Sequence, residues 1–74
     1  SSDLEVNTVR MNIEAERARL GLSKEELSRK LGISSKTYSK YVGGSPISSD
    51  ILVKMADLFD CSIDYLLGRN EVTA

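Results

Sequence analysis

Two lysines and two serines are spaced so that their side chains could contact nucleic-acid bases. Lys36 and Lys40 are four residues apart, so on a helix they lie on one face, and no Asp or Glu occurs in residues 35–42. Lysine can donate to guanine O6 and N7 in the DNA major groove, and Ser35 and Ser39 can donate or accept at a base or phosphate. Two lysines alone would favour an ordinary solvated helix face. The helices that carry them decide whether this face is merely solvated or reads DNA bases.

Those elements are predicted to be two short helices joined by a tight turn. Ser23-Lys-Glu-Glu26 matches a capping box and opens one helix, with leucines one turn apart on its inner face. Gly32 ends that helix, where a side chain would clash or strain the backbone, and Ser34 caps a second helix over residues 35–42. This is the layout of a helix-turn-helix, whose second helix can lie in a major groove.

Lys24 lies in the first turn of the earlier helix, where the helix dipole disfavours a positive charge. The position makes more sense if a phosphate lies nearby, because free amide groups at a helix start also attract phosphate. An exposed lysine without a partner is the alternative.

The remaining sequence predicts three further helices and no strand. Asn12 can cap a first helix that runs to Leu20, with Ile13 and Leu20 on its buried side. Ser48 or Ser49 caps a helix over residues 50–59, and a short helix over 62–67 ends at Gly68. We expect residues 1–11 to be a flexible N-terminal or vector-derived segment, residues 12–68 to form the domain, and residues 69–74 to be a tail.

Charge is unevenly distributed along the 74 residues, although the net charge is only −1. Residues 23–44 carry five basic and two acidic side chains, a net of +3, so positive charge gathers in the helix-turn-helix segment. A local patch matters more than the overall charge for binding a polyanion, because salt screens charges beyond roughly 10 Å.

Enzyme, metal and membrane functions find little support. The chain has no His and one Cys, which excludes an internal disulfide and a Cys/His zinc set, and a reducing cytoplasm is the simplest setting. Cys61 is expected to be a small buried apolar residue, and Asp57, Asp60 and Asp64 a solvated acidic face. We expect no catalytic residue, cofactor, metal, small-molecule ligand or membrane contact, since no apolar run reaches the ~18 residues of a membrane span.

Residues 12–68 resemble the phage Cro/CI-type (Xre-like) helix-turn-helix family. The matching residues are Arg17, Leu20-Gly21-Leu22-Ser23, Glu26-Leu27, Lys30-Leu31-Gly32-Ile33-Ser34, Thr37, Ser39, Gly44, Pro46, Ala56 and Ser62-Ile63-Asp64-Tyr65-Leu66-Leu67-Gly68. The resemblance implies an all-α, compact five-helix, lambda-repressor-like domain. It also implies a transcriptional regulator, above all a repressor, that binds an inverted-repeat operator as a homodimer.

Position by position, the resemblance makes Ser35, Lys36 and Lys40 the main base-reading residues, with Ser39 at the groove edge. The residues it places at the DNA backbone are Ser23, Lys24, Ser34, Thr37, Gly43, Gly44 and Ser45. Leu66, Leu67 and Val72 could supply an apolar dimer contact, unless the two leucines belong to the core.

The chain departs from the family pattern at two places. The family often pairs the arginine at position 17 with a glutamate at the end of the recognition helix, but that position is Val42 here. Arg17 must therefore find another partner, contact phosphate or stay solvated. The loop after this helix also lacks the usual Lys and Arg, which leaves open a protein-binding module of the same fold, such as an antitoxin or an anti-repressor partner, with weak DNA affinity.

Overall fold

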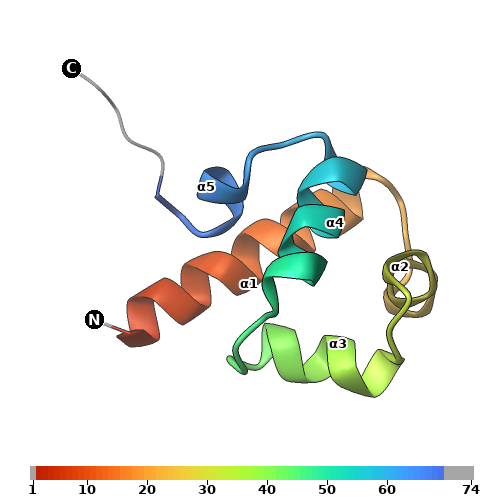
Figure 1. The fold of residues 1–74 in the computed structure, drawn as a ribbon, viewed down its shortest axis with the longest axis horizontal. Helices are drawn as coiled ribbons and strands as arrows, with labels where there is room; N and C mark the ends of the chain where they lie inside the picture. The colour runs from red at the N-terminus through yellow and green to blue at the C-terminus, as the bar shows by residue number, and fades with distance from the viewer. Residues whose placement is uncertain (1, 70–74) are drawn as a thin grey trace.

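A computed structural model describes residues 2–69, with side chains from residue 8 onward, and this part of the chain is all-helical. The five helices are α1 (Ser2–Arg19), α2 (Lys24–Leu31), α3 (Ser35–Val42), α4 (Ser49–Phe59) and α5 (Ile63–Leu66). In Figure 1, α3 lies along one edge of the molecule with α1 on its inner side, and α2 is seen end-on, so α2 crosses α3. The all-α, five-helix prediction is confirmed.

The first helix differs from its prediction, because α1 begins at Ser2 and the backbone of residues 2–11 is helical. Asn12 is therefore no cap: its side-chain amide donates to the Tyr65 carbonyl oxygen at 2.7 Å and joins α1 to α5. Leu20 is 37% exposed, so its predicted place in the core is wrong; the helix ends at Arg19 and the chain turns there.

Serine caps start all four later helices, as the spacing predicted. The hydroxyls of Ser23, Ser34 and Ser62 each accept from the amide three residues on at 3.0 Å. Ser48, rather than Ser49, does the same for α4 at 3.4 Å. Each cap satisfies one of the amides that a helix start leaves without an acceptor.

Every helix contributes to one apolar core. Its buried members are Ile13, Leu27, Leu31, Tyr38, Ile51, Met55, Ala56, Phe59 and Leu66. Leu66 is fully buried and cannot be a dimer contact in this fold, Leu67 is half-buried, and Val72 lies outside the described residues. Of the predicted tail over residues 69–74, only Arg69 falls within the described part.

The turn between α2 and α3 depends on the backbone conformation of Gly32. Its φ of 75° is left-handed, and a Cβ added there would meet only the Lys54 Nζ atom, at 3.8 Å. Of the two reasons the sequence offered for glycine, strain therefore applies and a clash does not.

Candidate nucleic-acid interface

Helix α3 has one anchored face and one free face. Tyr38 is fully buried, and Tyr41 and Val42 pack against the core from the same side. The four predicted base-reading residues of the same helix are all exposed: Ser35, Lys36, Ser39 and Lys40. The structure thus gathers these four residues on one surface that carries two positive charges and no negative charge from α3 itself.

The start of α2 is closed by a reciprocal cap. The Ser23 hydroxyl accepts from the Glu26 amide, and the Ser23 amide donates to the Glu26 carboxylate at 2.8 Å. These bonds lower the pKa of the Glu26 carboxyl, since the Ser23 backbone and side-chain bonds favour the charged form. Lys24 follows directly and is exposed.

Ser28 is a buried polar residue of α2 that the sequence reasoning did not single out. It is 2% exposed, and its hydroxyl donates to the Lys24 carbonyl oxygen at 2.7 Å, so its burial leaves no polar atom without a partner. The Ile33 amide in turn donates to the Ser28 carbonyl oxygen at 3.0 Å, which closes the turn toward α3. The available signal was a serine inside a helix, where its hydroxyl can bond to the carbonyl four residues earlier.

Ser34 and Thr37 are engaged with each other at the start of α3. The Ser34 hydroxyl accepts from the Thr37 amide and donates to Thr37 Oγ1, both at 3.0 Å. Ser34 is exposed and Thr37 is half-buried. Both residues lie at the start of α3, and their mutual bond fixes the first turn of that helix. Their contact with the DNA backbone stays a prediction.

The loop after α3 folds back on the helix. Gly43, Gly44 and Ser45 are all exposed, and the Ser45 amide donates to the Lys40 carbonyl oxygen at 2.9 Å. This bond keeps the loop beside the last turn of α3. The loop offers backbone groups but no positive side chain.

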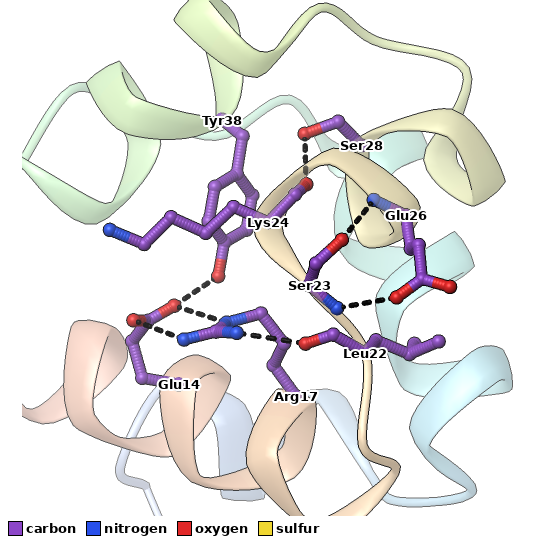
Figure 2. A network of polar contacts seen from close by, with 8 residues as sticks. All are labelled: Glu14, Arg17, Leu22, Ser23, Lys24, Glu26, Ser28 and Tyr38. Atoms are coloured by element: carbon purple, nitrogen blue, oxygen red, sulfur yellow. Dashed lines mark hydrogen bonds and ion pairs between the residues drawn. The ribbon is translucent and has the colours of Figure 1, made fainter.

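Arg17 forms an ion pair with a residue of its own helix. Its guanidinium forms two bonds to the Glu14 carboxylate, both at 3.1 Å, and a third to the Leu22 carbonyl oxygen at 2.8 Å. The Tyr38 hydroxyl donates to the same carboxylate. Figure 2 shows Glu14, Arg17 and Tyr38 converging at the entrance to α2, and we call these three residues the Glu14 cluster.

The Glu14 cluster joins α1, α3 and the segment before α2: the Glu14 carboxylate reaches α3, and the Arg17 guanidinium reaches Leu22. Glu14 and Arg17 come from α1, Leu22 is the residue before the α2 cap, and Tyr38 comes from the middle of α3. The bond from Arg17, against the effect of partial burial, holds the pKa of the Glu14 carboxyl below its usual value, and Tyr38 and Lys24 act in the same direction. Burial and the neighbouring Glu14 raise the pKa of the Tyr38 hydroxyl.

Other candidate chemistry is weak in the described part of the chain. Cys61 is half-buried rather than fully buried, and its burial raises the pKa of the thiol, which disfavours a reactive thiolate. No group of three potential metal-ligating side chains occurs in residues 8–69. None of the helices described is long and apolar enough to cross a membrane.

Comparison with known proteins gives a consistent picture. A family model described as "Helix-turn-helix" matches residues 13–66. The HTH-type transcriptional regulator ImmR of Bacillus subtilis (strain 168) is 34% identical over 58 residues, which cover 77% of this chain and 46% of ImmR. The chain thus spans about half the length of this curated relative, and no solved structure matches it. With its helices, caps and turn in the order of that motif, this chain belongs to the helix-turn-helix family of the phage Cro/CI type.

Proposed function

We propose that this domain binds double-stranded DNA in a sequence-specific manner and acts as a transcriptional regulator. Helix α3 enters the major groove, and α2 lies across the backbone and supports it. One observation carries the proposal: α3 is anchored through the buried Tyr38 and exposes two lysines and two serines.

Sequence is read from the exposed face of α3. Lys36 and Lys40 donate to guanine O6 and N7, while Ser35 and Ser39 bond to bases or to phosphates at the groove edge. A helix held through the buried Tyr38 can present these groups at a fixed height in the groove, which discrimination between bases requires.

Phosphate contacts come from the helix starts. At α2 the Ser23 amide is already bonded to Glu26, so the amides of Lys24 and Glu25 are the ones available to a phosphate, together with the Lys24 ammonium. Ser23 contributes to this phosphate site indirectly, because its cap fixes the first turn of α2. At the start of α3, we assign the phosphate contact to the first turn, which Ser34 and Thr37 form by bonding to each other. At the other end of α3, Gly43, Gly44 and Ser45 lie near the DNA backbone.

We further propose that the domain works as a homodimer on an inverted-repeat operator and represses transcription there. We assign three charged contacts to one copy, Lys24, Lys36 and Lys40, which predicts modest affinity for a single half-site. Two linked copies convert the second contact into an intramolecular event and multiply the affinity. ImmR, a longer protein, is itself described as a transcriptional regulator. Catalysis has no part in this proposal.

The decisive test is a gel-shift series with K36A and K40A against a duplex selected from random DNA by the wild-type chain. Each substitution should cost ~1–3 kcal/mol of specific binding and relax base preference at one position. K54A removes an exposed lysine of α4 that lies beside the Gly32 turn but outside α2 and α3, and it should cost less specific binding than either substitution. If neither recognition-helix substitution weakens binding while circular dichroism shows an intact fold, α3 is not the reading element.

A protein-binding module of the same fold is the second candidate. It is favoured by one observation, the exposed loop over residues 43–46 that lacks any basic side chain. A DNA-binding domain must show affinity for bulk DNA that falls steeply with salt, whereas an antitoxin or anti-repressor module need not. Titration of sonicated genomic DNA at several salt concentrations separates the two.

A further inference from the structure

Helix α1 carries a second cluster built like the Glu14 cluster. Arg19 Nε bonds to Glu16 Oε1 at 2.7 Å, and the Tyr65 hydroxyl donates to Glu16 Oε2 at 3.1 Å. Arg19 also donates to the Phe59 carbonyl oxygen at 2.8 Å. We call Glu16, Arg19 and Tyr65 the Glu16 cluster. Both clusters consist of a Glu, the Arg three residues later, a Tyr hydroxyl and a main-chain carbonyl.

The two clusters serve different halves of the domain. Glu14 and Glu16 are two residues apart, which turns their side chains about 200° from each other around α1. The Glu16 cluster holds the end of α4 and α5, whereas the Glu14 cluster holds the entrance to α2 and the middle of α3. The Glu14 cluster alone therefore touches the elements that we place on DNA.

We propose, on the basis of the function proposed above, that Glu14 is a positioning residue of the DNA interface with two effects. It fixes α3 through the Tyr38 hydroxyl, and it occupies the Arg17 guanidinium so that Arg17 does not bind phosphate. The Glu16 cluster has neither effect.

Arg17 lies where it could bind a DNA phosphate if Glu14 did not hold it. Arg17 bonds to the carbonyl of Leu22, the residue just before the α2 cap, and its side chain is 21% exposed. A phosphate at the start of α2 would thus lie near a guanidinium, a group whose planar donors suit phosphate. Phosphate contacts raise affinity for every sequence, so a free Arg17 would strengthen non-specific binding without improving discrimination.

Glu14→Gln tests the proposal because glutamine keeps the shape of the side chain and removes its charge. Binding of the full 74-residue chain to a mixed-sequence duplex and to the selected duplex is measured by fluorescence anisotropy over a series of KCl concentrations. E14Q should steepen the slope of log K against log[salt] by ~0.9 for each subunit, the value for one added phosphate contact. The ratio of specific to non-specific affinity should fall roughly tenfold, which corresponds to one hydrogen bond to a charged group.

Glu16→Gln is the matched control, since it removes the same charge from the same helix and disrupts a cluster of the same composition. It should leave both the salt slope and the affinity ratio unchanged. Two further variants separate the two effects. Y38F removes only the hydroxyl, so the affinity ratio should fall while the salt slope stays at the wild-type value. E14Q/R17Q removes the released guanidinium, so the slope should return to that of wild type.

The outcomes keep this proposal apart from the proposed function. If the wild-type chain binds neither duplex in a salt-dependent manner, the proposed function fails and the role of Glu14 fails with it. If wild type binds and E14Q has the same slope and affinity ratio as E16Q, only the role of Glu14 is overturned. Should E14Q lose its helical circular dichroism, R17Q decides: an unchanged slope supports an occupied Arg17, and a shallower slope shows that Arg17 already contacts phosphate.

Discussion

Glu14 joins α1 to α3 through the Tyr38 hydroxyl and holds Arg17, which in turn bonds to the residue before the α2 cap. These bonds have a pH dependence. The Glu14 carboxylate accepts from Arg17 and from Tyr38, and these bonds hold its pKa below the ordinary value of 4.5. A carboxyl with a lowered pKa in the folded state stabilises the fold above its unfolded pKa. That contribution is lost as the pH falls from about 4.5 through the lowered folded value.

We therefore predict that E14Q flattens the acid limb of the stability curve. The free energy of unfolding, measured by urea titration, should decline less between neutral pH and pH 3 in E14Q than in wild type, because the variant has no carboxyl at this position. Y38F should keep most of the decline, since the bond from Arg17 is the largest cause of the pKa shift. Equal acid limbs for wild type and E14Q would contradict the assignment.

At the residue scale, the sequence predicted the exposed side chains of α3 but not the hydrogen bonds that hold this helix in place. Ser35, Lys36, Ser39 and Lys40 are exposed together because their spacing on one helix is a local property. The roles of Glu14 and Tyr38 could not be derived in the same way, because 24 residues separate these two hydrogen-bonded side chains. Their meeting depends on how α3 packs against α1, which no local pattern encodes.

At the element scale, the helix ends were predictable because caps join residues only three apart. The four serine caps and the left-handed Gly32 follow this rule. The start of α1 was missed for a reason that can be named. Val9 packs against the core four residues before Ile13, so the apolar stripe continues beyond Asn12, where the sequence reading stopped.

Two glycines at helix ends should differ in what they tolerate. Gly32 and Gly68 share a φ of 75°, so alanine at either position incurs the left-handed penalty of about 1–2 kcal/mol. A Cβ at Gly32 meets little, but a Cβ at Gly68 would lie 2.4 Å from Thr8 Cγ2. We predict that G32A loses only the conformational amount, and that G68A loses more, because the Thr8 side chain, α1 or the turn after α5 must shift.

Urea unfolding of the two variants checks this order. A domain of this size has only a few kcal/mol of net stability, so the larger loss in G68A should lower the denaturation midpoint visibly below that of G32A. Equal midpoints would mean that Thr8 moves aside without cost. G32A should also retain DNA binding where it is folded, because the turn supports the interface without touching it.

At the scale of the whole molecule, a net charge near zero combines a positive segment with a negative remainder. The helix-turn-helix segment, residues 23–44, is net positive with five basic and two acidic residues, and the rest of the chain is net negative. The acidic side chains of α4 and its C-cap, which include Asp57 and Asp60, are exposed. On the proposed function, repulsion from these carboxylates would disfavour DNA approach from their side, within the Debye length of roughly 10 Å.

This distribution sets the expected salt dependence of the complex. If Lys24, Lys36 and Lys40 are the charged contacts of each copy, the slope of log K against log[salt] should be about −2.7 for one copy and about −5.4 for a dimer, at ~0.9 per phosphate. Footprinting on the selected duplex should show two half-sites with centres about one helical turn, roughly 34 Å, apart or a multiple of it. A dimer footprint with a much steeper slope would add further cations to the interface. Lys30, exposed in the last turn of α2, is the first to test, because K30A would then make the slope shallower by the same ~0.9 for each subunit.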